Sequence, residues 1–586
     1  MYLTKVAPLS RIPRPSPQFL AYFTKEKLKR GSLVLVPLRK KKVKAIVFSQ
    51  TNAIEKKIDI KKASYEIKPI IKILKKNPVI NENQIKLAKW IADYYWASFG
   101  KVLSIFLRNS KEAKEQKTIK NSFEKKIVIG NFEYFPKKEI EVALSQKKEV
   151  LFLVPEKKKE KFWKEKLKKY NSPNLIIGTR ASLFKPFESL GLIVLTQEGN
   201  KSYKSQMEPK YNAKKTAEEL AKIWQAKIII TSSFPSVETY YEAKKIALLK
   251  NKAEKIIVDM RKIKPWQPIS PPLLKNIKET GKRNKKTILF LQRRGEATTF
   301  FCKDCGWIQK CQDCEVPMTY HKKEKNPSLV CHYCAKEIQT PRLCKECKSW
   351  NLDLLGSGIE KTEKFLQKNF KKEKILRMDS DKTKTEKEQK SILEKFLKKD
   401  AGILLTTSII FKYFPIKKTA LLGIISIDSL LSQPDFKTEE ECARITQELL
   451  LCCKEKFILQ TFFPDAKAVS WIKKGKELFY KKTLKERKRF FYPPFSSLIK
   501  LSFGHKRKNT AKEEAYILKE KIEQKIKDKK EIEIIGPAPA FIEKIRGSYQ
   551  QNIIIKLKTK DKKVKMNILA QVPPSWRVDV DPERII

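Results

Sequence analysis

Eight of the eleven cysteines in this chain lie within one short segment and form four Cys-x-x-Cys pairs. The pairs are Cys302/Cys305, Cys311/Cys314, Cys331/Cys334 and Cys344/Cys347. Two thiolates separated by two residues reach one zinc ion from a single tight turn, and two such pairs complete a tetrahedral site. The segment therefore predicts two structural zinc ions.

Spacing also indicates which pairs share an ion. Sixteen residues separate Cys314 from Cys331, a gap that is typical of zinc ribbons. The first predicted site takes the four inner cysteines, Cys311, Cys314, Cys331 and Cys334. The four outer cysteines are then left to close around a second ion: Cys302, Cys305, Cys344 and Cys347.

A disulfide framework is the alternative use of paired cysteines. The sequence shows no signal peptide and no apolar run that approaches the ~18 residues of a membrane span. We therefore expect a cytoplasmic protein in a reducing compartment, where disulfides are rare and zinc is the better interpretation. Cys442, Cys452 and Cys453 show no ligand spacing and are expected to lie in the core.

The charge of the chain is strongly unbalanced. There are 128 Lys and Arg residues against 65 Asp and Glu residues, which gives a net charge of +63 over 586 residues. A polyanionic partner such as nucleic acid is the natural interpretation, through phosphate contacts and counterion release. A lysine-rich composition that only solvates helix surfaces is the alternative. The hydrophobic fraction of 41% argues against a disordered basic tail.

Short apolar runs alternate with lysine-rich helical stretches through the middle of the chain. Examples are residues 150–154, 192–195, 227–230, 288–291 and 422–425. Buried strands that alternate with helices indicate parallel sheets, here enough for two α/β lobes. This pattern alone does not distinguish a nucleotide-driven motor from any other α/β enzyme.

Five further motifs lie before and after the cysteine segment. They are WIADYY at 90–95, GTRASLF at 178–184, QRRG at 292–295, GPAP at 536–539 and VDVDP at 578–582. Together with the cysteines, they resemble the primosomal protein N′ family, the replication-restart DNA helicases called PriA. The resemblance runs nearly from end to end of the chain.

The resemblance implies an α/β fold with two RecA-like helicase lobes, at 126–285 and 286–464. The second lobe would carry a double zinc-ribbon insertion at 300–349. A mostly-β domain at 1–108 would bind DNA 3′ ends, and an α+β domain would occupy 465–586. Residues 109–125 look like a charged linker, because this stretch is too short for the winged-helix domain of the family.

The phosphate-binding loop of the family should lie between that linker and residue 150. Such a loop needs glycines whose backbone N–H groups surround the phosphates, a lysine, and a hydroxyl residue for magnesium. Here the matching stretch, residues 129–140, keeps only Gly130 and Lys137, and no hydroxyl follows the lysine. These two residues are the only candidates for ATP binding.

The position that should bind magnesium and orient the attacking water reads Thr196-Gln197-Glu198, so only Glu198 keeps a charge. In the motif that couples the lobes, residues 232–235, Phe234 replaces a hydroxyl residue.

The second lobe should supply an arginine finger. Gln447 persists, but Leu451 and Lys454 stand where arginines are expected. Lysine cannot reproduce the guanidinium fork, and loss of a finger costs on the order of 10³ to 10⁵ in rate. With Lys137, Gln197, Glu198, Gln447 and Lys454 as the degenerate catalytic positions, we expect no ATP hydrolysis. Loose binding of Mg·ATP without hydrolysis is the alternative for this cleft.

The DNA-binding positions are better kept. Phe19 matches an aromatic residue of the 3′-end pocket of the family, and Lys68 matches its lysine. Leu20 and Arg39 replace the expected Asp and Gly, which predicts weaker recognition of the 3′ end. Arg546, in a loop of the C-terminal domain, is a further candidate DNA contact.

The sequence thus predicts a zinc-binding protein of replication restart that binds forked or branched DNA, with a degenerate motor. The resemblance implies a helicase loader and a single-stranded DNA-binding protein as partners. One alternative is an active ATP-dependent 3′-to-5′ helicase. Another is a scaffold stabilised by zinc that does not act on DNA.

Overall fold

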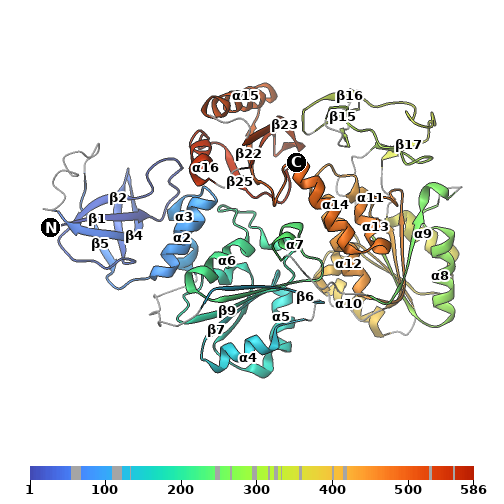
Figure 1. Cartoon of the computed structure of the whole chain (residues 1–586), viewed down its shortest axis with the longest axis horizontal. Coiled ribbons are helices and arrows are strands. Elements are labelled where there is room, and N and C mark those ends of the chain that lie inside the picture. Colours follow the sequence, from blue (N-terminus) through green and yellow to red (C-terminus); the bar gives the residue numbers. More distant parts are fainter. Residues whose placement is uncertain are drawn as a thin grey trace.

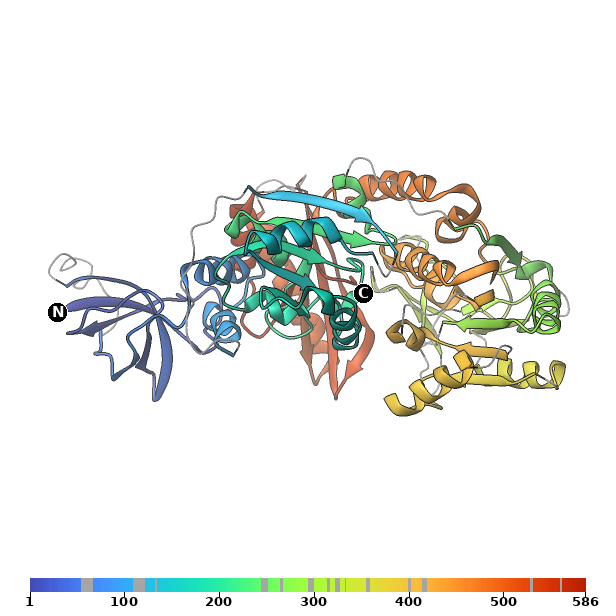
Figure 2. The same cartoon turned by 90° about the horizontal axis from the view of Figure 1, so that it is seen from below.

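The computed structural model describes most of the chain, and its strands form separate sheets along a long body (Figures 1 and 2). The described residues are 1–53, 67–108, 122–131, 134–243, 251–263, 267–292, 300–313, 317–321, 327–331, 333–354, 359–371, 373–398, 402–413, 419–526, 531–558 and 561–585. Both views place the N-terminal sheet at one end of the long axis and the second α/β lobe at the other.

A five-stranded antiparallel sheet opens the chain, in the order β2-β1-β4-β3-β5. Its strands are β1 (Tyr2–Pro8), β2 (Leu20–Thr24), β3 (Leu33–Leu38), β4 (Lys41–Asn52) and β5 (Lys72–Lys75). Two helices follow, α2 (Glu82–Tyr94) and α3 (Phe99–Arg108). Asn81 and Gln84 form a reciprocal capping box that fixes the start of α2. The predicted mostly-β domain is confirmed.

The first α/β lobe has a parallel sheet in the order β6-β10-β9-β7-β8. Its elements are β6 (Glu124–Ile129), α4 (Lys137–Ser145), β7 (Glu149–Leu153), α5 (Lys157–Lys166), β8 (Leu175–Gly178), β9 (Leu190–Leu195), α6 (Ala213–Trp224), β10 (Lys227–Ser232) and α7 (Val237–Ala243). Alternate residues of β7 face opposite layers. Val150 and Phe152 pack with α4 and α5, whereas Leu151 and Leu153 pack with α6.

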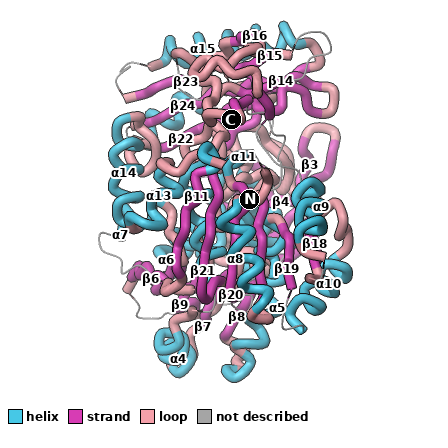
Figure 3. The backbone as a smooth tube through the Cα atoms, turned by 90° about the vertical axis from the view of Figure 1, so that its right-hand side faces the viewer, coloured by secondary structure: helices cyan, strands magenta, loops and turns pink. Residues whose placement is uncertain are grey.

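The second lobe has a six-stranded parallel sheet in the order β11-β21-β20-β12-β19-β18. Figure 3 shows this sheet from β11 to β18 with helices around it. Its elements are β11 (Glu254–Asp259), α8 (Pro271–Lys282), β12 (Lys286–Leu291), α9 (Ile359–Asn369), β18 (Ile375–Met378), α10 (Glu386–Lys398), β19 (Gly402–Thr406), β20 (Thr419–Ser426), α11 (Asp428–Leu431), α12 (Thr438–Leu451) and β21 (Cys453–Thr461).

The second lobe begins earlier than the sequence indicated. The sequence predicts a boundary between residues 285 and 286, but β11 pairs with β21, and α8 packs on β12 and β20. Both elements therefore belong to the second lobe. The apolar run of β11 is short and lies far along the chain from its partner strand, so local pattern could not assign it to either lobe.

The cysteine segment is inserted between β12 and α9. It contains the short strands β13 (Phe300–Cys302), β14 (Thr319–His321), β15 (Ser328–Val330), β16 (Glu337–Gln339) and β17 (Leu352–Leu354). The first and last of these, β13 and β17, pair with each other, whereas β14, β15 and β16 form a separate sheet. The insertion therefore leaves the lobe and returns to it at one place.

Helices α13 (Lys467–Lys474) and α14 (Lys476–Arg489) follow the second lobe and pack on α12 and α7. A four-stranded antiparallel sheet completes the chain, in the order β23-β24-β22-β25. Its domain consists of β22 (Ser497–His505), α15 (Lys508–Lys525), β23 (Ile532–Ile545), β24 (Ser548–Leu557), α16 (Lys562–Leu569) and β25 (Arg577–Val580). This is the predicted α+β domain.

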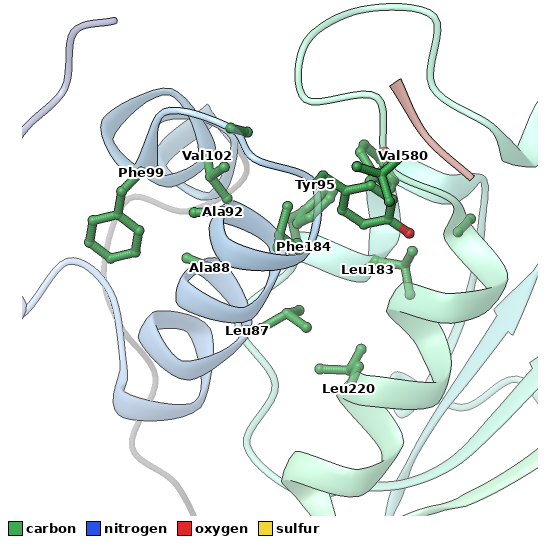
Figure 4. Close-up of a cluster of buried hydrophobic side chains, with 14 of the residues drawn as sticks. Leu87, Ala88, Ala92, Tyr95, Phe99, Val102, Leu183, Phe184, Leu220 and Val580 are labelled. Atoms are coloured by element: carbon green, nitrogen blue, oxygen red, sulfur yellow. The ribbon is translucent and has the colours of Figure 1, made fainter. Parts of the chain in front are cut away.

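A shared hydrophobic core joins the N-terminal domain, the first lobe and the C-terminal sheet. Figure 4 shows Leu87 of α2 and Tyr95, directly after α2, facing Phe184 and Leu220 of the first lobe, with Val580 of β25 beside them. All five side chains are almost fully buried. Burial of such side chains contributes roughly 1.5–3 kcal/mol each, so the three units are held in a fixed relation.

The linker prediction for residues 109–125 falls mostly on residues 109–121, which lie outside the described residues. Among the helices that the structure does describe, none is both long enough and apolar enough to cross a membrane.

Candidate metal centres and the cleft between the lobes

The outer four cysteines meet at one point. The Sγ atoms of Cys302 and Cys347 lie 3.6 Å apart, as do those of Cys305 and Cys344, and all four lie within 4.8 Å of one another. Four sulfurs around a tetrahedral zinc ion, each at about 2.3 Å, are separated by roughly 3.8 Å. The geometry fits a zinc site without rearrangement.

The inner cysteines that the structure describes also come together. Cys311, Cys331 and Cys334 place their Sγ atoms within 4.8 Å of one another, and those of Cys311 and Cys334 are 3.6 Å apart. Cys314, the fourth predicted ligand, lies outside the described residues. The two groups are the nested sets that the spacing predicts, and none of the ten described cysteines forms a disulfide.

Three of the Cys-x-x-Cys pairs adopt one and the same turn. In each, the N–H of the first cysteine donates to the carbonyl five residues later, in Trp307, Lys336 and Ser349 respectively. The N–H of the residue four positions after the first cysteine donates to the carbonyl of that cysteine. This residue has a left-handed backbone in all three turns, with φ of 79° at Gly306, 64° at Ala335 and 59° at Lys348. This turn brings the two thiols of a pair to the same side, as a shared metal ion requires.

The loop after β6, where phosphates should bind, is occupied by the chain itself. A Cβ atom at Gly130 would lie 2.4 Å from Cβ of Tyr134, so the tyrosine covers the glycine. Phe135 packs on Trp163, with ring centroids 5.9 Å apart. Lys137 begins α4, and its Nζ lies 3.9 Å from the carboxylate of Glu141. Residues 132–133 of the loop lie outside the described residues.

Glu198, the one carboxylate kept at the magnesium position, is buried and fully engaged. It forms an ion pair with Lys214, at 3.1 Å, and accepts hydrogen bonds from the hydroxyls of Ser236 and Thr239, both at 2.7 Å. Burial alone would raise its pKa, but the charge of Lys214 and these hydrogen bonds lower the pKa of Glu198 to about 2. The carboxylate is therefore ionised, and its oxygens already have protein partners.

The residues before Glu198 offer no replacement for a metal-binding carboxylate. Thr196 is 2% exposed, and its hydroxyl donates to the carbonyl of Leu153 at 3.0 Å. Gln197 is half-buried and has a left-handed φ of 53°. The described residues of this site therefore do not fit Mg·ATP.

The arginine-finger positions on the second lobe are equally unsuited. Gln447, on α12, is 1% exposed, and both atoms of its amide lack a hydrogen-bond partner among the described residues. Leu451 ends the same helix, whereas Lys454 lies beyond it, exposed in β21. Gln447 and Lys454 thus lie on different elements, and one is buried whereas the other is exposed.

The two lobes touch each other directly across the cleft. A Cβ atom at Gly199 of the first lobe would lie 2.8 Å from Cδ of Arg444 of the second. Lys158 on α5 forms an ion pair with Glu386 on α10, at 3.3 Å. Lys201 forms another with Glu441 of α12.

Phe234, which replaces the hydroxyl residue of the coupling motif, is 1% exposed. Its ring centroid lies 5.5 Å from that of Trp471 on α13, and 5.4 and 5.3 Å from those of Phe479 and Tyr480 on α14. The Tyr480 hydroxyl donates to the carbonyl of Pro235 at 2.7 Å. The aromatic substitution therefore joins the first lobe to the helices that follow the second.

Arg487 on α14 joins the same elements by charge. The guanidinium is 2% exposed and lies 3.1 Å from Glu238 of α7 and 2.7 Å from Glu440 of α12. Burial raises the pKa of Glu440 to about 7, against the opposing effect of Arg487. Sequence reasoning missed this role, because Arg487 stands in a run of basic residues that resembles a solvated helix face.

The predicted DNA contacts lie on different domains. The Phe19 ring is half-buried and packs against Phe48 and Phe99, with centroids 4.4 and 5.1 Å away, so it also has a structural use. Lys68 is exposed beside the N-terminal sheet, and Arg546 is exposed at the turn between β23 and β24. The structure does not bring Arg546 together with Phe19 and Lys68, and their contact with DNA stays a prediction.

Three protein-family models match the chain. They are described as "3'DNA-binding domain (3'BD)", at residues 11–108, "PriA DNA helicase Cys-rich region (CRR) domain", at 311–338, and "Primosomal protein N C-terminal domain", at 488–583.

Whole proteins that match most of this chain are also found. The "Replication restart protein PriA" of Borreliella burgdorferi is 30% identical over 567 residues, which cover 84% of this chain and 85% of the relative. The protein of the same name from Helicobacter pylori is 27% identical over 95% of both chains. That of Bacillus subtilis is 30% identical over 66% of this chain and 50% of its own length.

Replacement of Arg487 by methionine should destabilise the protein. The change leaves Glu238 and Glu440 buried without their shared counter-charge, which costs about 3–5 kcal/mol. We expect a clearly lower thermal unfolding midpoint for Arg487→Met. Lys488→Met, at the exposed neighbouring position of α14, should unfold at the wild-type temperature, and equal shifts for both variants would show that the guanidinium is unimportant.

The pH dependence gives an independent measurement of the same network. The pKa of Glu440 is raised from 4.5 to about 7 in the folded protein, so folding keeps a proton that the unfolded chain releases. The contribution of Glu440 to stability is fully present below about pH 4.5 and is lost as the pH rises through 7. In Arg487→Met, this loss should extend to higher pH, because the counter-charge that lowers the pKa is gone.

Proposed function

Because the chain belongs to the family of the replication restart protein PriA, we propose that it binds forked or branched DNA during replication restart without hydrolysing ATP. The observation that carries the second half of this proposal is the state of Glu198. Its oxygens are bound by Lys214, Ser236 and Thr239, and no second carboxylate stands beside it at Thr196 or Gln197.

DNA binding is supported by charge and by the domain match. A net charge of +63 favours a polyanion, and residues 11–108 match a 3′ DNA-binding domain. We propose Lys68 and Arg546 as phosphate contacts, since both are exposed cations on the outer domains. Phe19 is proposed as a stacking surface at the rim of its aromatic cluster. These contacts, and not an ATP-driven step, would determine which strand of the fork the protein binds.

Loss of the ATPase activity is supported by four independent substitutions that act on one reaction. Tyr134 covers Gly130, Thr196 replaces a carboxylate, Phe234 packs where a hydroxyl residue is expected, and Leu451 replaces an arginine. Each alone would lower a rate, and together they affect phosphate binding, metal binding, coupling and charge stabilisation. Lys137 is proposed as no more than a surface cation, because Glu141 is its nearest partner.

We propose that the Cys-rich region holds two zinc ions. The outer ion would be bound by Cys302, Cys305, Cys344 and Cys347, and the inner ion by Cys311, Cys314, Cys331 and Cys334. The Sγ separations and the three identical turns support this assignment. The ions would be structural, since four protein sulfurs leave no open coordination position.

A protein that does not hydrolyse ATP would act by binding DNA and partner proteins at the same time. We propose a helicase loader and the single-stranded DNA-binding protein as its partners in the cytoplasm, because reloading a replication fork requires both.

Metal content tests the two-ion assignment. The wild-type protein is expected to contain two zinc ions per chain by elemental mass spectrometry, and the double variant Cys344→Ala/Cys347→Ala one. Removal of the pair Cys311/Cys314 should also leave one ion. Cys442→Ala changes a buried cysteine outside both groups and should keep both ions. A single ion in the wild type, or loss of both ions from either double variant, would contradict the assignment.

Assays with forked DNA test the function. We expect binding that weakens steeply with salt and ATP turnover that does not rise above the level without DNA. Glu198→Gln is the control, because any turnover from a contaminating ATPase is unaffected by it. DNA-stimulated hydrolysis that Glu198→Gln abolishes would establish a DNA-dependent ATPase and contradict the proposal, in favour of the helicase alternative. Absence of salt-dependent DNA binding would favour the scaffold alternative.

A further inference from the structure

A hollow lies where the N-terminal domain, the first lobe and the C-terminal domain meet. It has a volume of about 520 Å³ and is lined by residues 11–14, 95–98, 206, 208–210 and 572–578. This volume is in the range of pockets that hold small organic ligands. The hollow contains none of the residues assigned above to zinc, to the cleft between the lobes or to DNA. It is built on the shared core of Figure 4, which also contains Tyr95.

The charges that line the hollow are mainly positive. Arg11, Arg14, Lys210 and Arg577 are opposed within the lining by one carboxylate, Glu208. The Arg11 guanidinium is half exposed and forms an ion pair with the half-exposed Glu208, at 3.4 Å. Arg577 is exposed and forms no ion pair with any described residue. The guanidinium of Arg577 and the exposed part of that of Arg11 can therefore contact an anion that enters.

Aromatic surface accompanies these cations. Trp96 is half-buried in the lining, and the guanidinium carbon of Arg14 lies 5.3 Å from its ring centroid. Trp96 has a φ of 54°, a left-handed conformation that is unusual for a bulky residue. Trp576 also lines the hollow; it is 4% exposed, and its indole N–H has no acceptor among the described residues. An unsatisfied buried donor is rare in proteins.

We propose that this hollow binds one nucleotide of single-stranded DNA, with the base against Trp96 and the adjacent phosphates at Arg11 and Arg577. Bases stack on indole rings and on guanidinium planes with little sequence preference. Arginine forks match phosphate geometry. A site for inorganic phosphate alone would not need the two tryptophans, and an apolar peptide would not need the cations.

The hollow lies where three units of the protein meet. The inference rests on the proposed DNA-binding function and deepens it, because a strand held in the hollow touches three units of the protein at once. The N-terminal domain supplies Arg11 and Trp96, the first lobe supplies Lys210, and the C-terminal domain supplies Arg577 and Trp576. A single-stranded segment thus contacts the protein at the point where these units are already fixed to one another.

The test uses the full chain, a short fluorescent oligothymidylate and a blunt duplex of the same length. Arg11→Gln/Arg577→Gln is expected to bind the oligothymidylate at least tenfold more weakly than the wild type. The slope of log K against log salt should become shallower by about 1.4, because each phosphate contact on a single strand contributes about 0.7. Affinity for the duplex should change less than twofold.

Two further variants separate the contributions. Trp96→Leu should weaken oligothymidylate binding by about 5- to 160-fold, as loss of one stacked base does, with the salt slope unchanged. Arg507→Gln removes an exposed arginine of the same C-terminal domain outside the hollow and should leave binding unchanged. Circular dichroism and the thermal midpoint of each variant must match the wild type, so that lost binding is not lost folding.

The outcomes distinguish the two proposals. If the wild type binds DNA with a salt slope and the hollow variants bind oligothymidylate equally well, this inference is wrong while the proposed function stands. If the wild type binds no DNA, the proposed function itself fails. If the variants lose affinity for an acidic peptide but not for oligothymidylate, the hollow is a peptide site and the inference is overturned.

Discussion

The buried guanidinium of Arg487 is the interaction on which the placement of the two lobes depends. It lies between a carboxylate of α7 in the first lobe and one of α12 in the second, and helix α14 supplies it from outside both. Removing three charges from water is costly unless each has its partner. The network therefore forms only when all three elements are in place. The charges of the protein itself, together with the aromatic contacts of Phe234, define how the lobes face each other.

The same logic explains Glu198. A carboxylate that binds a catalytic metal needs free oxygens and a neighbouring acidic group, but here a lysine and two hydroxyls occupy it. Glu198 thus contributes to the internal support of the fold, at the position where the family resemblance implies a catalytic carboxylate. The parallel sheets and the grouping of the cysteines are formed by other residues.

The grouping of the cysteines and the parallel sheets could be predicted from the sequence, because the patterns that indicate them lie within short segments. Nested grouping of the cysteines followed from the gap between Cys314 and Cys331, and the parallel sheets followed from short buried runs such as Val150–Val154. Signals that depend on distant partners were out of reach. The strand β11 joins the second lobe through a pairing with β21, nearly two hundred residues later. Arg487 and Arg577 look alike in the sequence, yet one is buried between carboxylates and the other is exposed at a hollow.

The way in which the Cys-rich region joins its lobe has an evolutionary consequence. Its first and last strands, β13 and β17, pair side by side, with Phe300 opposite Leu354. Chain entry and exit are therefore separated by only one strand spacing, roughly 4.8 Å. A segment joined by one such strand pair can change in length at its outer loops without altering the sheet below it. Tyr333 of the region, which packs in one cluster with Phe436 and Tyr492, is the contact that such changes must keep.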